Sequence, residues 1–413
     1  MKETGIEWIG AIPDSWRLNK IGQLFNLRNE KVSDKVYAPL SVSRGGVVPQ
    51  MESVAKSDAS DDRKLVLVGD FAINSRSDRK QSCGVSPLDG SVSLINLILY
   101  AKDGNAIYND YMNYLLKNYG FAEEFYRWGH GIVADLWTTR WQEMKNIMLP
   151  LPSVEMQKKL FEYLTEKSAE IDRLIEIENQ QIEKLKEYKQ AVITEAVTKG
   201  LDKSAPMKDS GVDWIGEIPQ GWKVVKLKNL FKNVSIKNHG KDTVLSVYRD
   251  YGVLPKDSRD DNFNVTSLDT DSYKYVENGD LVINKMKAWS GSLSISNYTG
   301  IVSPAYYVCK VDYSKVDKRF IHNFLRNKYL VSYYAMLSSG LRIGQWDLSI
   351  DDFLSIKIAL PLLEKQQKIA RAIDDKSEEI DSLIEIKQKK IDELNEYKKS
   401  LIYEYVTGKK EVV

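Results

Sequence analysis

The side chains best suited to chemistry in this sequence are basic and polar residues that cluster in two short loops. Residues 75–82 carry three cations and one acid among small serines, and residues 285–292 carry two lysines and a tryptophan with no acid. Such side chains at a loop tip can contact phosphate groups and guanine edges. A solvated surface loop remains the alternative interpretation. The candidate residues are Arg76, Arg79, Lys80, Gln81 and Ser82 in the first loop, and Lys285, Lys287 and Trp289 in the second.

Two further groups of residues could contribute to the same chemistry. Arg44 and Arg249 occur at matching places in the two halves of the chain, which favours phosphate or structural contacts over sequence-specific ones. A cluster of tryptophan and polar residues precedes the last strand expected in each half, where a role in the core is equally open. Its members are Trp137, Thr138, Thr139 and Arg140 in one half, and Arg342, Gln345 and Trp346 in the other.

Catalytic and metal-binding motifs are absent from the sequence. It contains no phosphate-binding loop, no Asn-Pro-Pro-aromatic string of the kind found in amino-methyltransferases, and no glycine-rich site for S-adenosylmethionine. A loose match to a metal-nuclease pattern, Asp135 with Glu143 and Lys145, has no counterpart in the second half. The two cysteines lie far apart and no histidine pair has zinc-ligand spacing, so we expect neither a disulfide nor a structural zinc site.

Length and composition indicate a globular protein of two or three domains. The chain has 413 residues, of which 43% are hydrophobic and 28% charged, and this composition excludes wholesale disorder and collagen-like structure. With no apolar run of about 18 residues and no signal peptide, we expect a soluble cytoplasmic protein without a membrane segment. Because the net charge is only +1, a nucleic-acid surface would have to arise from segregated charges.

The chain contains the same module twice. A string built around Gly-x-x-Trp-Ile-Gly-x-Ile-Pro-x-x-Trp recurs at an offset of 206 residues, and a Gly-Asp-x-x-Ile-Asn string and a Leu-Pro-Leu strand recur in the same order. We expect the repeated tryptophans to pack at the start of each module. The repeated strings occupy residues 5–16 and 211–222, 69–74 and 279–284, and 149–151 and 360–362.

Within each module, short β-branched runs alternate with turn residues, which predicts a mixed α+β fold with mostly antiparallel strands. Apolar and aromatic residues recur at a spacing near 3.6 in residues 108–126 and 318–337. This spacing predicts one helix late in each module.

Each module leads into a long charged segment, residues 155–198 and 364–407, whose seam residues alternate in steps of four and three. That spacing predicts coiled-coil helices about 65 Å long, and each thin apolar stripe requires a partner. We expect the two helices to pack together, antiparallel in preference to parallel, giving a pseudo-two-fold arrangement in which Glu178 and Lys387 lie close. The seam comprises Ile171, Ile175, Glu178, Ile182 and Leu185 in the first helix, and Ile380, Ile384, Lys387, Ile391 and Leu394 in the second.

These features together resemble the specificity (S) subunits of type I restriction-modification systems. The resemblance covers essentially the whole chain and rests on the repeated string at 211–222 with its echo at 5–16, the Leu-Pro-Leu strands, and Gln157 and Gln366 at the start of the long helices. A glutamate usual before that glutamine is replaced here by Met156 and Lys365.

The resemblance implies a non-catalytic subunit in which two target recognition domains each read half of a split DNA sequence. The paired helices would set the spacing and dock two adenine methyltransferase subunits and, in the full complex, restriction subunits. The chain would need no cofactor itself, and S-adenosylmethionine, ATP and Mg²⁺ would belong to its partners. The implied division is 1–151 for the first domain, 152–200 for the first helix, 201–362 for a linker and the second domain, and 363–413 for the second helix and tail.

The alternative is a two-headed scaffold that binds proteins rather than DNA. Because the frame repeats while the loops at 75–82 and 285–292 differ, the DNA-binding interpretation predicts two half-sites of different sequence. Salt-dependent DNA binding separates the two interpretations, since neutralising phosphates makes affinity fall steeply with salt.

Overall fold

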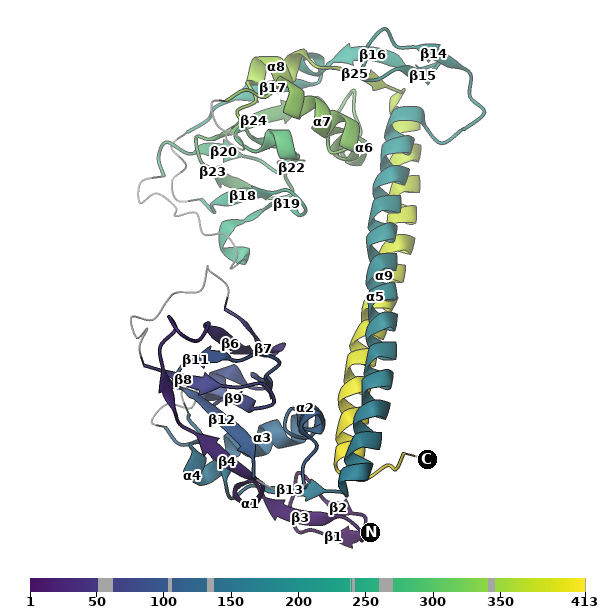
Figure 1. The fold of residues 1–413 in the computed structure, drawn as a ribbon. Helices are drawn as coiled ribbons and strands as arrows, with labels where there is room; N and C mark the ends of the chain where they lie inside the picture. The colour runs from purple at the N-terminus through teal and green to yellow at the C-terminus, as the bar shows by residue number, and fades with distance from the viewer. Residues whose placement is uncertain are drawn as a thin grey trace. The chain divides into compact units, whose positions relative to one another are not determined.

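The computed structural model describes residues 1–50, 62–102, 106–131, 137–237, 239, 242–259, 270–340 and 346–412. The chain forms two compact units, the first from residues 1–179 with 388–413 and the second from residues 180–387. Each unit holds one module together with part of each of two long helices (Figure 1). The fold is therefore α+β with a duplicated module, as the sequence predicts.

The module of the first unit is built on a four-stranded antiparallel sheet with the order β10-β9-β12-β4. A three-stranded sheet, β11-β8-β5, and three strand pairs, β13-β3, β6-β7 and β1-β2, complete it. Trp8 and Trp16 are buried in its core, as expected. The strands are β1 (Lys2–Glu3), β2 (Ala11–Ile12), β3 (Arg17–Lys20), β4 (Phe25–Arg28), β5 (Lys31–Val32), β6 (Leu40–Ser43), β7 (Gly46–Pro49), β8 (Arg63–Val66), β9 (Phe71–Asn74), β10 (Cys83–Val85), β11 (Gly90–Val92), β12 (Asn96–Ala101) and β13 (Met148–Leu151). The helices before the long one are α1 (Ile21–Leu24), α2 (Met112–Leu115), α3 (Tyr119–Arg127) and α4 (Trp141–Met144).

The module of the second unit repeats this architecture. Its four-stranded sheet has the order β22-β21-β24-β17, which matches the first strand for strand, and the pairs β16-β25, β18-β19, β20-β23 and β14-β15 accompany it. Trp222 is buried and Trp214 stacks on Tyr333. The strands are β14 (Met207–Asp209), β15 (Glu217–Pro219), β16 (Lys223–Lys226), β17 (Phe231–Val234), β18 (Leu245–Tyr248), β19 (Gly252–Pro255), β20 (Lys274–Val276), β21 (Leu281–Asn284), β22 (Leu293–Ile295), β23 (Gly300–Val302), β24 (Tyr306–Val311) and β25 (Lys357–Leu360). The helices are α6 (Lys318–Leu325), α7 (Lys328–Leu337) and α8 (Ile350–Ser355).

The single helix expected late in each module is wrong, because two helices stand there. In the first module an asparagine, Asn118, starts α3 by accepting a hydrogen bond from the Phe121 amide at 3.0 Å. In the second, Asn327 starts α7 by accepting from the Tyr329 and Leu330 amides. An asparagine that caps a new helix interrupts the preceding one, although the apolar spacing continues through it.

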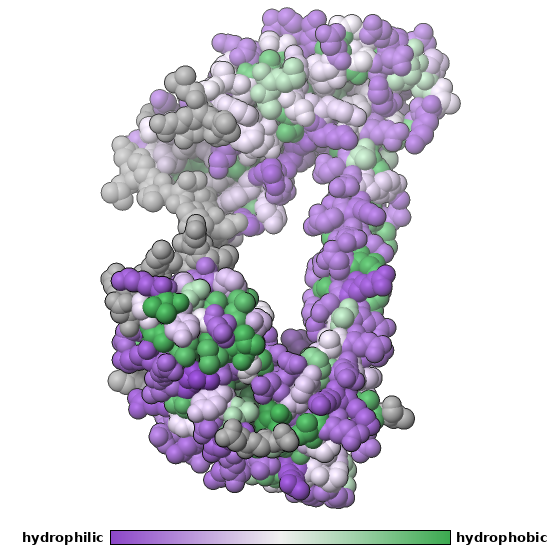
Figure 2. Space-filling model, in the orientation of Figure 1, coloured by the Kyte–Doolittle hydropathy of each residue, from purple (hydrophilic) through white to green (hydrophobic). Residues whose placement is uncertain are grey.

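The two long helices are α5 (Val154–Lys199) and α9 (Leu363–Val406), and they pack together in antiparallel fashion within each unit. In the first unit the Tyr405 and Tyr163 hydroxyls lie 3.1 Å apart, and Lys398 reaches Asp172 at 2.6 Å. In the second, Lys189 reaches Asp381 at 2.6 Å. Figure 2 shows that the exposed surface of this helix pair is mostly hydrophilic.

The seam residues are buried or half-buried. Ile171, Ile182, Ile380 and Ile391 are among the buried members, while Ile175, Leu185, Ile384 and Leu394 are half-buried. Within the first unit the buried Glu178 carboxylate accepts from Lys390 at 2.6 Å. Within the second, Lys387 donates to Gln181. The close approach of Glu178 to Lys387 would join the two units, and it stays a prediction.

A buried glutamine fastens the start of each long helix to its module. The Gln157 amide accepts from the Tyr108 amide at 2.9 Å and donates to the Ala106 and Pro152 carbonyls. Gln366 makes the equivalent three bonds to Asp317, Lys315 and Pro361. The repeated glutamine is therefore a structural clamp.

Candidate nucleic-acid interface

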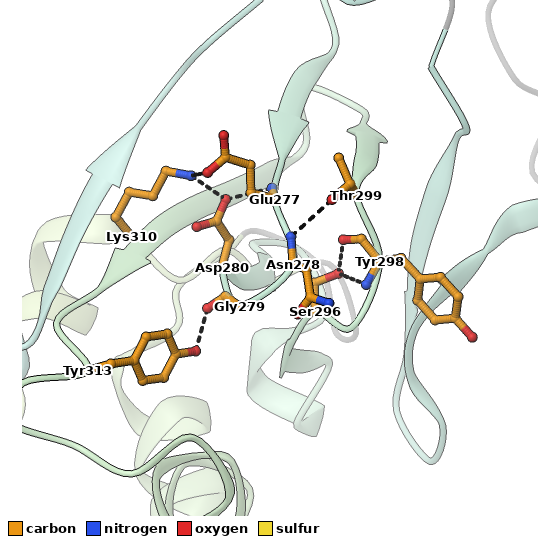
Figure 3. A network of polar contacts seen from close by, with 9 residues as sticks. All are labelled: Glu277, Asn278, Gly279, Asp280, Ser296, Tyr298, Thr299, Lys310 and Tyr313. Carbon is orange, nitrogen blue, oxygen red and sulfur yellow. Dashed lines mark hydrogen bonds and ion pairs between the residues drawn. The ribbon is translucent and has the colours of Figure 1, made fainter.

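The turn that leads to each candidate loop is held by a buried aspartate from the Gly-Asp-x-x-Ile-Asn string. In the second module Asp280 accepts from the Glu277 amide at 2.8 Å, and its carbonyl accepts from the Ser296 amide at 2.8 Å (Figure 3). In the first, Asp70 accepts from the Leu67 amide at 2.9 Å. The preceding glycine has a positive φ of 88° in one module and 100° in the other, which explains why glycine recurs there.

A basic residue neutralises each aspartate, but it comes from a different strand in each module. Arg28 on β4 pairs with Asp70 at 2.6 Å, and the hydrogen bond to Asp70 raises the pKa of Arg28. Lys310 on β24 pairs with Asp280 at 2.9 Å and with Glu277 at 2.7 Å (Figure 3). The local charge balance has been kept while its source has changed.

The asparagine that ends the string starts the candidate loop. The Asn74 side chain accepts from the Arg76 amide at 3.0 Å, and the Asn74 amide donates to the Ser82 carbonyl at 2.9 Å. The Asn284 side chain accepts from the Met286 amide at 3.2 Å, and its amide donates to the Ser292 carbonyl at 3.0 Å. Both loops are therefore closed at the base by backbone groups, which place no demand on the side chains at the tip.

In the first loop the cations differ in how they are held. Arg76 is exposed, and among the described residues its guanidinium has no partner. Arg79 faces its neighbour Asp78 at 3.6 Å, with both side chains exposed. Lys80 lies 3.0 Å from both carboxylate oxygens of Glu123 on α3. Arg76 is thus the cation most available to a phosphate or base.

Gln81 has a φ of 63°, a left-handed conformation that is uncommon outside glycine. Strained residues of this kind concentrate at functional sites, and the conformation sets the direction in which the half-buried Gln81 side chain leaves the loop. Ser82, which follows, is buried, so we remove it from the candidate contacts.

The structure brings the second predicted cluster against the first loop. The Ser77 amide donates to the Trp137 carbonyl at 2.9 Å, and Thr138 forms a bridge with Arg76. Thr139 is fully buried and its hydroxyl donates to the Phe125 carbonyl at 2.7 Å, so it holds the segment in place instead of facing a ligand. Trp137 and Arg140 are exposed beside the loop.

The second module joins the same two segments with different side chains. Trp289 packs edge to face on Trp346, with ring centroids 5.3 Å apart, and both rings are half-buried. Lys285 lies 3.9 Å from Asp347, while Lys287 is exposed without a partner among the described residues. The predicted contacts Arg342 and Gln345 lie outside the described residues.

Arg44 and Arg249 lie in the turns of the equivalent hairpins β6-β7 and β18-β19 and are both exposed. Arg44 donates to the Lys80 carbonyl at 3.4 Å, which places it beside the first loop. Arg249 pairs with its neighbour Asp250 at 3.1 Å, and this hydrogen bond raises the pKa of Arg249. Only Arg44 keeps a charge that no carboxylate neutralises among the described residues.

Sequence reasoning missed a pair of equivalent lysines that support these edges. Lys64 donates to the Asn96 carbonyl at 2.8 Å and Lys274 to the Tyr306 carbonyl at 2.5 Å, and burial lowers the pKa of both. The positive charges of Lys285 and Lys237 also lower the pKa of Lys274, so the second module gathers three lysines near its loop. Their matching positions in the repeat were the available signal.

Catalytic metal chemistry finds no support in the described part of the chain, where no three His, Cys, Asp or Glu residues are grouped to hold a metal ion. Cys83 and Cys309 are buried free thiols, and burial raises the pKa of each to about 12, which leaves them unreactive. No helix among the described residues is both long and apolar enough to cross a membrane.

Comparison with known proteins decides the family. The sequence model of the type I restriction modification DNA specificity domain matches residues 219–396. The type I restriction enzyme MjaX specificity subunit of Methanocaldococcus jannaschii is 26% identical over 88% of this chain and 87% of its own length. The MjaVIII specificity subunit from the same organism is 31% identical over 55% of this chain and 54% of its own length. This chain belongs to the type I specificity-subunit family.

The fold agrees with this assignment. A chain from a structure of the assembly and conformational transition of a type I restriction-modification system superimposes with a TM-score of 0.62, at 14% identity, over 96% of this chain and 98% of its own. Members of the family are specificity subunits, which are non-catalytic, so the protein is not itself an enzyme. The resemblance stated from the sequence is confirmed.

Proposed function

We propose that this specificity subunit reads a bipartite, asymmetric DNA target and docks two adenine methyltransferase subunits and, in the full complex, restriction subunits. Residues 1–151 and 201–362 would contain the two target recognition domains, and residues 152–200 and 363–413 would contain the helices between them. The complex would act on double-stranded DNA in the cytoplasm. The bound S-adenosylmethionine, ATP and Mg²⁺ would belong to the partners, because methylation requires a catalytic pocket that receives a flipped base.

One observation carries this proposal: the two modules close their loops with the same backbone hydrogen bonds and fill them with different side chains. The first presents arginines, among them the free Arg76, and the second presents lysines beside a tryptophan pair. Arginine and lysine contact phosphates and guanine edges, so two different loops favour two different half-sites. The candidate contacts that remain accessible are Arg44, Arg76, Arg79, Lys80, Gln81, Trp137, Thr138, Arg140, Arg249, Lys285, Lys287, Trp289 and Trp346.

The test maps N6-methyladenine in a plasmid library exposed to this subunit together with the methyltransferase subunit of its system. We expect methylation within one split sequence whose two halves differ. Binding of the same DNA by the purified complex should weaken steeply as salt rises from 50 to 200 mM, roughly 10³-fold or more if six or more phosphates are neutralised.

Two outcomes would contradict the proposal. Methylation at a symmetric target would show that the two loops do not read different half-sites. DNA binding that is insensitive to salt and to sequence, together with stable binding of proteins by both modules, would favour the two-headed scaffold.

A further inference from the structure

Six large apolar residues are exposed on the long helices, and they form two equivalent sets. Each is between 38% and 63% exposed, whereas the buried seam isoleucines are at most 6% exposed. Leu174, Ile177 and Tyr188 on α5 correspond, at an offset of 209 residues, to Leu383, Ile386 and Tyr397 on α9. Apolar residues at such exposure cost free energy in water unless a partner covers them.

The antiparallel packing divides the six residues into one patch per unit. In the first unit the Asp172–Lys398 pair brings the stretch of α5 with Leu174 and Ile177 beside the stretch of α9 with Tyr397. We call these three residues the first patch. In the second unit the Lys189–Asp381 pair does the same for the second patch, formed by Leu383, Ile386 and Tyr188.

Both patches lie on the flank of the helix pair that carries the residues immediately before the seam positions. Lys390 on that flank reaches Glu178 at 2.6 Å across the first unit, so the flank borders the opposite helix. The other flank carries Asp172, which lines a crevice of the first unit together with Gln81 and Asn113 of the module. The module therefore covers one flank and leaves the patch on the other open.

The pattern is wider than a two-helix seam requires. A two-stranded coiled coil needs apolar residues only at the two seam positions of each heptad, whereas a helix that faces a bundle core carries a third apolar row. Here the third row consists of the patch residues, while the seam itself contains the polar residues Glu178, Lys189, Lys387 and Lys398. The helices thus have the pattern of bundle members that lack further helices.

Residue identity shows that both patches suit the same ligand. Leucine, isoleucine and tyrosine recur unchanged in the two sets, although exposed neighbours differ: Arg173 corresponds to Ser382 and Lys184 to Glu393. The loops at 75–82 and 286–292 have also diverged. An exposed surface kept identical within one chain, beside positions that have changed, indicates one kind of partner bound twice.

We propose that each patch binds one amphipathic α-helix, and that this helix is contributed by one copy of the methyltransferase subunit. The helix would place apolar residues, one turn apart, against the leucine, isoleucine and tyrosine and would extend the α5–α9 pair into a three-helix bundle. In Figure 2 apolar residues interrupt the hydrophilic surface of the helix pair, in keeping with such a site. The inference rests on the proposed docking function and names its contact surface.

The test counts bound subunits by native mass spectrometry of the full chain with excess methyltransferase subunit. Variant A is Leu174→Gln with Ile177→Gln, variant B is Leu383→Gln with Ile386→Gln, and variant AB combines them. Glutamine is a good helix former, so circular dichroism should show the helices intact. The matched control is Glu187→Gln with Glu396→Gln, an equivalent exposed pair away from the patches.

We expect two bound subunits for the wild type and the control, one for variants A and B, and at least tenfold weaker binding at both sites in AB. Two subunits on AB with unchanged affinity would overturn the patches as the contact surface while leaving docking itself intact. Failure of the wild type and control to bind any subunit would instead overturn the proposed docking function, and the inference with it. Dimerisation of the wild type alone, lost in AB, would identify a second copy of this chain as the occupant and would also overturn the proposal.

Discussion

The loop at 75–82 and the loop at 285–292 leave their sheets through the same hydrogen bonds but present different chemistry. In the first, Arg76 is free and Lys80 is held by Glu123. In the second, Trp289 and Trp346 pack together beside Lys285 and Lys287. The donors and acceptors that close each loop are backbone groups and one asparagine, so the tip residues are free to change without loss of the frame.

The long helices show the opposite behaviour. Their seam and patch residues repeat with little change, because packing against a partner constrains each side chain. Side chains that pack are kept and side chains that only read are replaced, and this contrast can be tested in both regions.

The largest expected effect comes from removing the reading side chains. Arg76→Ala with Arg79→Ala and Lys80→Ala should abolish or relax recognition of one half-site only, since each lost base contact costs about 1–3 kcal/mol. Lys285→Ala with Lys287→Ala and Trp289→Ala should affect only the other half-site. Methylation mapping with each variant provides the measurement. If either triple variant changed both half-sites, or neither, the loop assignment would be wrong.

Removing the frame aspartate should destabilise its own module by about 3 kcal/mol. Asp70→Ala leaves Arg28 without its partner, and Asp280→Ala does the same to Lys310, in addition to the lost backbone bonds. Hydrogen exchange of β9 and β21 distinguishes the two modules. Glu277→Gln is the control, because it removes only the more exposed arm of the Lys310 pair and should cost less than about 1 kcal/mol.

The buried glutamine clamps should be equivalent in the two modules. Gln157→Ala and Gln366→Ala each leave three backbone groups without a partner, which should cost about 2 kcal/mol. Urea unfolding followed by hydrogen exchange near residues 106–108 and 315–317 measures each effect. A cost confined to one variant would show that the two helix starts are not held in the same way.

A histidine should make only the second module sensitive to mild acid. Burial, with the charges of Arg326 and Lys318, lowers the pKa of His322 to about 4, while Asn113 occupies the equivalent position in the first module. The unfolded chain binds a proton near pH 6.5, so the stabilisation is complete above that pH and is lost as the pH falls toward 4. Between pH 7 and 5 the second module should lose about 1–2 kcal/mol, measured by urea unfolding. His322→Asn should remove this dependence, and an unchanged profile in that variant would contradict the assignment.

The smallest effect concerns Glu123. Glu123→Gln frees Lys80 from an exposed ion pair, so DNA affinity should rise by less than about 1 kcal/mol, with the gain fading at high salt. The equivalent residue in the second module is Ser332, so Ser332→Ala is the control and should have no effect. Binding titrations at two salt concentrations measure both variants, and a weaker affinity for Glu123→Gln would show that the carboxylate orients Lys80 for binding.

The sequence by itself determined the duplication, the α+β class, the two long helices and the loops that differ between the modules. Each of these follows from spacing or repetition along the chain, which local backbone geometry enforces. The repeated glutamine was visible as a marker of the family, and its buried hydrogen bonds explain why it recurs.

Only the tertiary structure decided which residues share a surface. It joined residues 75–77 to residues 137–139, buried Thr139 and Ser82, broke the expected single helix at Asn118 and Asn327, and left the six patch residues exposed. Burial of a side chain depends on contacts with segments far away in the sequence. Periodicity reports only that a residue faces one side of its own helix or strand, and the packing of the other elements decides whether that side is covered.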